Sequence, residues 1–266
     1  MPNLPTLLSA SDPAPFALER ADAGSHFVLV CDHAGRRIPD RLGRLGLRED
    51  VLATHIAWDI GIADTSRRLA AKLDAVLVTQ TYSRLVIDAN RPLASPESIV
   101  TLSGSHAVSG NERLSDADRA QRAQEIFDPY HDCIRGVLDR REKEGRTTLL
   151  VAMHSFTPVF LDRPRAWHAG VLYNRDARFA RRVLTEMRRG GRWVVGENEP
   201  YAASDATDYT IVVHGEQRGL AHVELEVRQD LLTDAHGREE WADRLAQALE
   251  AAHRAMRADR AGPRKT

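Results

Sequence analysis

The sequence contains very little cysteine. Only Cys31 and Cys133 occur among 266 residues, and neither belongs to a CxxC motif. Two cysteines this far apart in the chain indicate neither a disulfide framework nor a thiolate metal site. A reducing cytoplasm is therefore the compartment that we expect for this protein.

An excess of charge of one sign is also missing, as is any long apolar run. Lys and Arg number 37 and Asp and Glu number 38, so no overall field favours nucleic acid or an anionic membrane. The N-terminus has no basic segment followed by a sustained hydrophobic stretch, and no later run approaches membrane-spanning length. We expect a soluble, cytoplasmic protein that binds neither nucleic acid nor a membrane.

The length of the chain indicates its domain organisation. A chain of 266 residues, of which 42% are hydrophobic, is able to bury a sizeable core, and one large α/β domain is simpler than two small ones. Four prolines among the first 25 residues predict an irregular leader over residues 1–25. One catalytic domain is expected over residues 26–257, followed by a disordered basic tail over residues 258–266.

Continuous apolar runs predict the strands of a central sheet. The run Leu149–Met153 has no polar alternation, which suits a strand covered on both faces, as in parallel α/β sheets. Further runs occur at residues 27–31, 75–79, 85–87, 169–173 and 192–196. Amphipathic helical patterns lie between several of these runs. The expected architecture is an α/β three-layer sandwich with a mixed, largely parallel central sheet.

Two other segments have a pattern of their own. The helical pattern over residues 47–73 is broken near residues 58–61, and a long helix is expected from Ser115 to about Arg141. The segment 103–112 is rich in Ser, Gly and His, which predicts a mobile surface loop.

Polar residues that are able to bind a metal follow the apolar runs. His33 comes just after the first run, and His154 ends the central one. Asp59 lies at the break in the helical pattern, and Glu226 alternates with apolar residues in a strand over residues 222–228. Ligands gather at the carboxyl ends of strands in open α/β sheets, and two histidines with one carboxylate form a typical catalytic zinc site. A simpler alternative is that these histidines only cap turns.

Four motifs together resemble the N-formylglutamate amidohydrolase family. They are Asp32-His-Ala-Gly35, Ser83-Arg-Leu-Val-Ile-Asp-Ala-Asn-Arg-Pro92, Met153-His-Ser-Phe156 and Glu224-Leu-Glu-Val-Arg-Gln-Asp-Leu231. The resemblance extends from Phe27 to Leu232. It implies the architecture of zinc carboxypeptidases and aspartoacylases and a single catalytic zinc ion.

The resemblance implies that His33 and His154 are zinc ligands. The resemblance identifies the third ligand less directly, because the wider architecture has a His-x-x-Glu pair and this chain has Arg36 at the glutamate position. Asp59 resembles a family aspartate and is the carboxylate that we choose. Asp32 and Glu197 are the alternatives.

The resemblance also implies residues for catalysis and substrate binding. Glu226 would be the general base, with Glu224 on the same strand face as its rival, and Arg84 would polarise the substrate carbonyl. Asn90 and Arg91 would bind the substrate carboxylate, because a guanidinium makes two parallel hydrogen bonds to such a group. The alternative is that Arg91 is only a charged side chain on the surface.

His214 is a further candidate for the substrate site, although a structural, hydrogen-bonded histidine is the alternative for this residue.

The function implied by the resemblance is a zinc-dependent amidohydrolase. Its substrate would be a small acidic N-acyl amino acid such as N-formylglutamate, which would yield formate and L-glutamate. A zinc carboxypeptidase-like peptidase and a non-catalytic protein that binds small ligands on the same fold are the alternatives. A peptidase needs an open cleft, whereas long loops are able to close over a small molecule.

Overall fold

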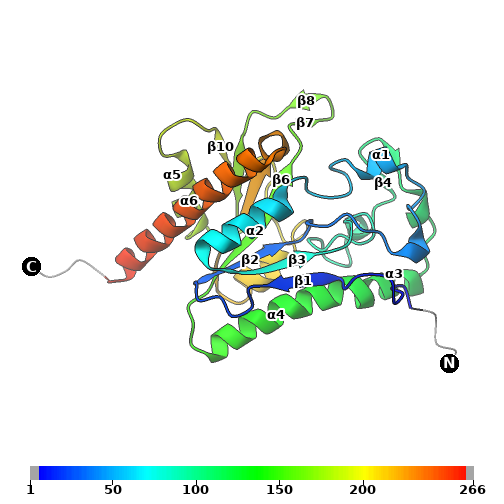
Figure 1. Ribbon diagram of the computed structural model, residues 1–266, viewed down its shortest axis with the longest axis horizontal. Coiled ribbons are helices and arrows are strands. Elements are labelled where there is room, and N and C mark those ends of the chain that lie inside the picture. Colours follow the sequence, from blue (N-terminus) through cyan, green and yellow to red (C-terminus); the bar gives the residue numbers. More distant parts are fainter. Residues whose placement is uncertain (1–5, 262–266) are drawn as a thin grey trace, which may run out of the picture.

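A seven-stranded sheet forms the middle layer of the protein (Figure 1). The computed structural model describes residues 6–261. The order of the strands is β1 (Phe16–Glu19), β3 (Val76–Gln80), β2 (Phe27–Cys31), β6 (Leu149–Phe156), β11 (Ala221–Arg228), β9 (Ala169–Leu172) and β10 (Val195–Glu197). Strands β3, β2, β6 and β11 are parallel, β1 is antiparallel to β3, and β9 is antiparallel to β11 but parallel to β10. The predicted mixed, largely parallel sheet is therefore confirmed.

Helices cover both faces of this sheet. They are α2 (Ile62–Leu73), α5 (Ala180–Arg188) and α6 (Ala235–Ala261) on one face, and α4 (Asp128–Lys143) with the π-helical segment η5 (Ile211–Glu216) on the other. Strand β2 shows why two layers are needed. Phe27, Leu29 and Cys31 join the first core and Val28 and Val30 join the second, all of them buried. A strand that is apolar on both faces requires a covering layer on each, which gives the predicted three-layer sandwich.

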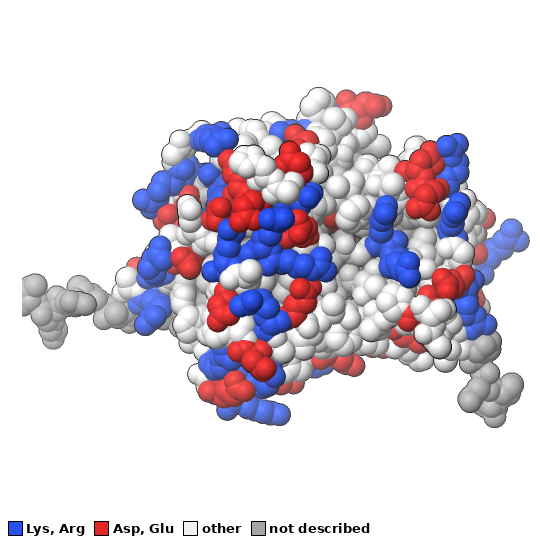
Figure 2. Space-filling view, in the orientation of Figure 1, with Lys and Arg blue, Asp and Glu red and all other residues white. Residues whose placement is uncertain are grey.

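Ion pairs join α2 to α6 at the outer surface. Arg68 pairs with Glu239 at 2.5 Å, and Lys72 pairs with Asp243 at 2.7 Å. Figure 2 shows basic and acidic side chains interspersed over this face. Each exposed pair contributes little to stability. Their mixture nevertheless leaves no broad area of one charge on the face shown.

The remaining elements are short or lie outside the sheet. They are η1 (Asp40–Leu42), α1 (Glu49–Leu52), η2 (Pro96–Ser98), β4 (Leu102–Ser103), β5 (His106–Ala107), η3 (Ser109–Asn111), α3 (Asp116–Arg122), η4 (Ala123–Phe127), β7 (Val159–Phe160), β8 (Arg163–Pro164) and η6 (Gln229–Leu232). The long helix expected from Ser115 is continuous through α3, η4 and α4, and the Ser115 side chain caps it. Among residues 6–261, no helix is long and apolar enough to cross a membrane.

Two segments near the ends of the described chain, residues 6–261, differ from the prediction, and residues 1–5 of the predicted leader lie outside that part. The leader expected to be irregular over residues 1–25 contains β1, which pairs with β3 at the edge of the sheet. Helix α6 continues to Ala261, so the part of the predicted tail from residue 258 to 261 is helical. The rest of that tail, residues 262–266, lies outside the described part of the chain. Pairing with a distant strand and packing of a long helix are tertiary effects that local composition does not reveal.

The predicted strand over residues 85–87 is instead a buried turn. The Leu85 N–H donates to Ser83 Oγ at 3.2 Å, and the Val86 N–H donates to the Ser83 carbonyl at 2.9 Å. Both apolar side chains are buried, and a short apolar run does not distinguish a strand from a buried turn. The predicted mobile loop over residues 103–112 also has structure, since it includes the β4–β5 hairpin and η3.

Two glycines permit the chain turns that lead to the site. Gly61 has a φ of 80° at the start of α2, and a Cβ there would lie 2.5 Å from Leu232 Cβ. A Cβ on Gly35 would lie 1.9 Å from the Thr81 carbonyl oxygen. Only glycine allows both close approaches. The breaks predicted after the first strand and before α2 therefore have a steric cause.

Candidate metal centre and cavity

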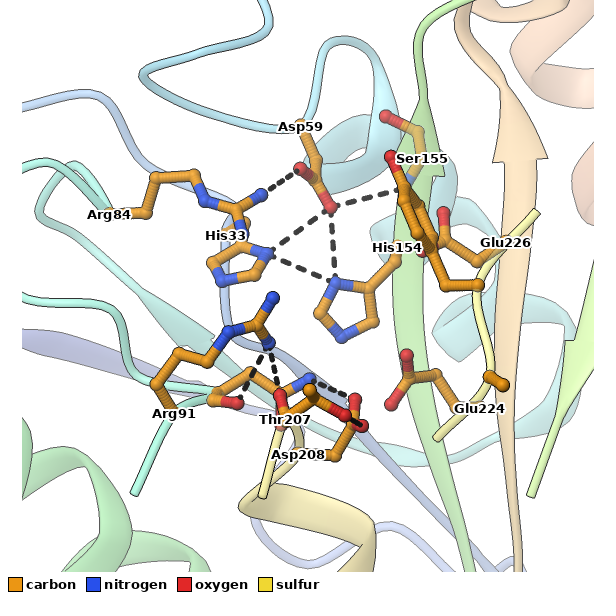
Figure 3. Close-up of a pocket in the computed structure, with 13 residues that line it drawn as sticks. His33, Asp59, Arg84, Arg91, His154, Ser155, Thr207, Asp208, Glu224 and Glu226 are labelled. Carbon is orange, nitrogen blue, oxygen red and sulfur yellow. Dashed lines mark hydrogen bonds and ion pairs between the residues drawn. The ribbon is translucent and has the colours of Figure 1, made fainter. Parts of the chain in front are cut away.

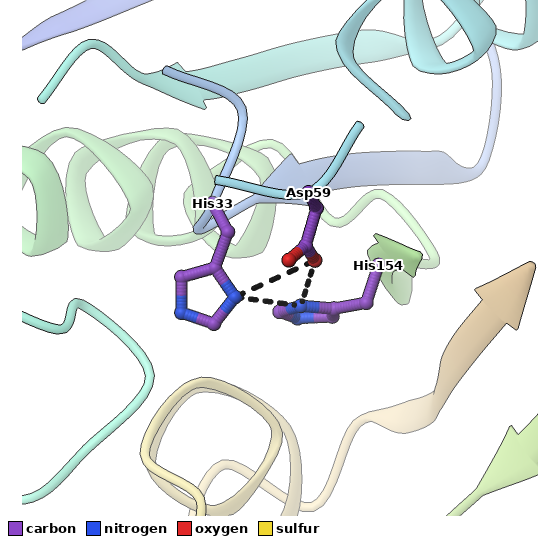
Figure 4. Close-up of side chains that lie close together, drawn as sticks. All are labelled: His33, Asp59 and His154. Atoms are coloured by element: carbon purple, nitrogen blue, oxygen red, sulfur yellow. Dashed lines mark hydrogen bonds and ion pairs between the residues drawn. The ribbon is translucent and has the colours of Figure 1, made fainter. Parts of the chain in front are cut away.

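His33, Asp59 and His154 meet at the carboxyl ends of two neighbouring strands (Figure 4). His33 follows β2, and His154 lies in β6, which pairs with β2. Asp59 comes from the turn before α2, where its N–H donates to the His33 carbonyl at 3.0 Å. The Ser155 N–H in turn donates to Asp59 Oδ2 at 3.1 Å. Main-chain hydrogen bonds therefore hold the carboxylate against both histidines.

The three donor atoms have the spacing of a metal site. His154 Nδ1 lies 3.1 Å from both His33 Nδ1 and Asp59 Oδ2, and His33 Nδ1 lies 3.5 Å from Asp59 Oδ2. Ligands at about 2.0–2.1 Å from a tetrahedral zinc ion are separated by about 3.3–3.4 Å. All three residues are buried. The donor set and its geometry thus fit a divalent metal such as zinc.

Each histidine also has its own carboxylate partner at its outer ring nitrogen, Nε2. Asp88 Oδ1 lies 2.7 Å from His33 Nε2, and Asp32 Oδ2 lies 3.2 Å from His154 Nε2. Such partners fix which ring nitrogen carries the proton and turn the other toward a metal. In both histidines the nitrogen left for a metal is therefore Nδ1.

Asp32 is itself held in place from the other face of the sheet. The Tyr130 hydroxyl from α4 donates to its Oδ1 at 2.9 Å, and the Thr210 hydroxyl donates to the same atom at 2.7 Å. Burial acts to raise the pKa of Asp32, but the hydrogen bond and charge of His154 outweigh it and lower the pKa to about 2. Asp32 is therefore an ionised carboxylate that orients His154.

The geometry distinguishes the three carboxylates considered from the sequence. Asp59 supplies the oxygen that faces both histidines, whereas Asp32 contacts only the outer nitrogen of His154. Glu197 binds the Tyr173 hydroxyl and pairs with Arg181, and it does not belong to the group. Asp59 is thus the carboxylate best placed to be a ligand.

A cavity of about 250 Å³ opens over the three residues (Figure 3). It is lined by His33, Asp59, Arg84, Asn90, Arg91, His154, Ser155, Tyr201, Ala202, Thr207, Asp208, Glu224 and Glu226. The lining combines the candidate metal-binding group with two arginines and three further carboxylates. Such a mixture is typical of a site that binds a small polar molecule.

Both arginines of the cavity already make hydrogen bonds with other residues of the protein. Arg84 donates to Asp88 Oδ2 at 2.9 Å and lies 3.5 Å from Asp59 Oδ1. Arg91 Nη1 donates to the carbonyls of Asn90 and Thr207, and its Nε donates to Glu97. Among the residues that the structure describes, Arg91 Nη2 has no such partner. It is the nitrogen of this side chain that is left for a ligand.

Asn90 lines the cavity, but its side chain already has several partners. Its Oδ1 accepts hydrogen bonds from the N–H groups of Tyr209 and Thr210, and its Nδ2 donates to Asp208 Oδ1 at 3.3 Å. These contacts hold the start of η5 beside the cavity. Asn90 thus positions the segment beside the cavity, and its contact with a substrate stays a prediction.

The prediction that His214 binds substrate needs correction. His214 does not line the cavity, and its ring stacks on His131, with Nε2 lying 3.0 Å from His131 Nδ1. Both rings are buried between α4 and η5. The hydrogen-bonded structural alternative considered from the sequence describes this residue better.

Glu224 and Glu226 lie on one face of β11 and line the cavity. Both are buried, and within residues 6–261 the Oε2 atom of each has no hydrogen-bond partner. Burial raises the pKa of both carboxyls to about 8, against the opposing charge of His154. The alternation of this strand is thus explained by the cavity that its polar face lines.

Sequence reasoning missed several residues of the site. Asp88 lies inside the motif that contains Asn90 and Arg91, but its contact with His33 was not predicted. Tyr201, Thr207 and Asp208 come from an irregular segment between β10 and η5 and show no pattern that would mark them.

Comparisons with known proteins agree with this architecture. The model of the N-formylglutamate amidohydrolase family matches residues 25–233. The solved gene product Atu2144 of Agrobacterium tumefaciens is 34% identical, and the match covers 94% of this chain and 99% of that chain with a TM-score of 0.92. The N-formylglutamate amidohydrolase of Ralstonia eutropha JMP134 is 17% identical, and the match covers 92% of this chain and 100% of that chain with a TM-score of 0.62, a likeness of fold. A comparison with curated protein sequences finds no match.

Proposed function

Because the chain belongs to the N-formylglutamate amidohydrolase family, we propose that it is a metal-dependent hydrolase of the amide or formamide bond of a small N-acyl amino acid. The observation that carries this proposal is the convergence of His33 Nδ1, His154 Nδ1 and Asp59 Oδ2 at the base of a cavity. These three residues would hold one divalent ion, with zinc the first candidate because it prefers two imidazoles and one carboxylate with an open position.

A metal in this position would act as a Lewis acid on the substrate carbonyl and on water. Glu226 is the residue that would take the proton from the attacking water and deliver it to the leaving amine. A carboxyl whose pKa is raised to about 8 by burial suits both halves of that transfer near neutral pH. Arg84 lines the same cavity and would stabilise the negative charge that develops on the carbonyl oxygen.

The register of the sheet favours Glu226 over Glu224 as the base. Glu226 lies directly beside His154 across the β6–β11 pair, whereas Glu224 lies beside Ala152, two residues further from the strand ends. The Cα of Glu226 is thus the closer of the two to a metal ligand. A base must reach the water that attacks the substrate, and this position supports that role.

Arg91 supports a substrate that carries a carboxylate. Its Nη2 is left for a ligand, while its other nitrogens are held by the Asn90 and Thr207 carbonyls and by Glu97. The cavity has a volume of about 250 Å³, which suits a small molecule better than a peptide chain. An N-acyl amino acid such as N-formyl-L-glutamate, which would yield formate and L-glutamate, is therefore the first substrate class to test.

Metal analysis and a substrate panel test this function. Purified protein is expected to bind about one equivalent of zinc and to hydrolyse members of a panel of N-formyl and N-acetyl amino acids. His33→Ala and His154→Ala should each lower metal affinity by roughly tenfold or more while the protein stays folded. His236→Ala, at an exposed histidine of α6, is the matched control. Full metal occupancy in both site variants would overturn the proposed ligands, and a metal-loaded protein inactive on every amide would favour a binding protein.

A further inference from the structure

Residues 84–91 contribute four side chains to the candidate site without forming a helix or a strand. They are Arg84, Asp88, Asn90 and Arg91. A segment outside helices and sheets lacks the regular hydrogen bonds that fix those elements. Its position relative to the candidate metal-binding group therefore depends on the groups that bind its carbonyls.

Two buried side chains from outside this segment bind the carbonyls of Leu85 and Val86. Asn111 Nδ2 donates to the Leu85 carbonyl at 2.8 Å, and Arg122 Nη1 donates to the Val86 carbonyl at 2.8 Å. The same nitrogen of Arg122 donates to Asn111 Oδ1 at 2.7 Å. Asn111 is 0% exposed and Arg122 is 2% exposed. The two side chains therefore hold the turn at residues 85–86 as a connected pair.

Arg122 is a buried cation that, among residues 6–261, has no carboxylate partner. Its hydrogen bonds are to the carbonyls of Val86 and Gly110 and to the Asn111 side chain. Burial lowers the pKa of its guanidinium to about 10, so the group stays charged at neutral pH. A buried charge without an opposite charge is costly, but a planar guanidinium binds several acceptors in fixed directions. This cost is understandable if the position of the turn matters to the site.

The helix that carries Arg122 also supports the other end of the segment. Arg122 is the last residue of α3, and Tyr130 and His131 follow in α4. His131 Nε2 donates to the Ala89 carbonyl at 2.9 Å, and the Tyr130 hydroxyl donates to Asp32 at 2.9 Å. One long helix thus contacts both the segment and a carboxylate of the candidate metal centre.

The π-helical segment η4 brings Arg122 and Tyr130 to the same side of this helix. In an unbroken α-helix, residues eight apart are rotated by about 80° relative to each other. A π-helical turn uses one more residue than an α-helical turn, which reduces the rotation to about 20°. The segment therefore aligns the contact that Arg122 makes with the contact that Tyr130 makes.

We propose that Arg122 is a positioning residue of the site, although it does not itself line the cavity. Through the Val86 carbonyl it places Asp88 beside His33 and keeps Arg91 in the cavity. The kinetic part of its test rests on the amidohydrolase function proposed above, whereas a zinc titration does not require turnover.

Two variants of Arg122 test this role. Arg122→Met removes the donors and should weaken zinc binding roughly tenfold, because Asp88 would no longer be held against His33. At saturating zinc, kcat/KM for N-formyl-L-glutamate should fall roughly 10- to 100-fold, the effect of displacing a positioned group by about 1 Å. The loss should be smaller for its α-methyl ester, which lacks the carboxylate proposed to bind Arg91. Arg122→Lys keeps the charge but not the planar fork, and should lie between the wild type and Arg122→Met.

Arg141→Met is the matched control. Arg141 is 1% exposed, lies on the same long helix and has no carboxylate partner among the described residues. Its Nε donates to Thr148 Oγ1 at 3.0 Å, just before β6 and toward the opposite end of that strand from His154. Burial lowers its pKa to about 10, as it does for Arg122. Arg141→Met should therefore lower the melting temperature, while zinc affinity and the ratio of kcat/KM between acid and ester stay at wild-type values.

The outcomes separate this inference from the proposed function. Wild-type zinc affinity in a folded Arg122→Met protein would overturn the positioning role, and so would an equal loss of affinity in Arg141→Met. If Arg122→Met does not fold, the same comparison is made with Arg122→Lys. Weaker zinc binding confined to the Arg122 variants, with no hydrolysis of any amide by the wild type, would support the positioning role and overturn the amidohydrolase. Hydrolysis by the wild type that is unchanged in the Arg122 variants would support the amidohydrolase and overturn the positioning role.

Discussion

Asp88 joins three groups of the candidate metal centre, and the variant Asp88→Asn tests how that centre is held. Its Oδ1 accepts from His33 Nε2 at 2.7 Å and from the Asn90 N–H at 2.9 Å, while its Oδ2 accepts from Arg84 Nη2 at 2.9 Å. Every one of these neighbours is a donor. A carboxylate satisfies all of them, but an amide has only one accepting atom.

Neither orientation of an asparagine at position 88 fits these donors. If its oxygen faces His33 and the Asn90 N–H, then its NH₂ opposes the Arg84 guanidinium. If it is turned round, its NH₂ opposes the Asn90 N–H and forces His33 to accept at Nε2, which places the ring proton on Nδ1, the atom that faces the metal site. Loss of such an outer partner typically weakens metal binding by about 10- to 100-fold, or about 1.4–2.8 kcal/mol.

Asp32→Asn is the matched control for this prediction. The partners of Asp32 Oδ1 are the hydroxyls of Tyr130 and Thr210, which are able to accept as well as donate, so an amide is able to turn there. We expect Asp32→Asn to weaken zinc binding by less than Asp88→Asn. Competition titrations with a fluorescent zinc chelator measure both affinities, and thermal melts check that both variants fold. Wild-type affinity in Asp88→Asn, or a larger loss in Asp32→Asn, would refute the reasoning.

Three further predictions follow from the site and its surroundings. Glu226→Gln should keep its metal and lose roughly two to four decades of kcat, measured by metal analysis and steady-state kinetics; if only Glu224→Gln behaves in this way, Glu224 is the base. Arg91→Lys should lower kcat/KM by roughly 30- to 1000-fold for an acid substrate but little for its methyl ester, and equal losses would mean that Arg91 does not bind the carboxylate. Burial lowers the pKa of His131 to about 4 and of His214 to about 3, from 6.5. Below pH 6.5 the unfolded state therefore binds more protons than the folded state, so the free energy of unfolding is highest above pH 6.5 and decreases as the pH falls below that value. Each ring should account for a loss of roughly 2 kcal/mol by about pH 5, and urea unfolding at pH 7 and pH 5 should show a smaller pH effect in His131→Gln; an unchanged effect would contradict this origin.

The sequence by itself predicted the framework of the site. Leu149–Met153 and Phe27–Cys31 are apolar at every position, which is typical of strands covered on both faces, and both are central strands of the sheet. The position of the candidate metal-binding group follows from those strands, because the carboxyl ends of parallel neighbours meet at one edge. The resemblance to the family, read from four motifs, was confirmed by the family model over residues 25–233.

Only the tertiary structure decided which atoms lie against which. The pairing of Phe16–Glu19 with β3 and the turn over residues 85–87 depend on partners that are distant in the sequence or buried around them. The tertiary structure also distinguishes between side chains of the same residue type. Asp32 and Asp59 were both candidate ligands. They differ in position because Tyr130 and Thr210 bind Asp32 and hold it at the Nε2 atom of His154. Periodicity reports burial and direction along one element, whereas the partner of a polar side chain is set by the packing of several elements, and that information is not local.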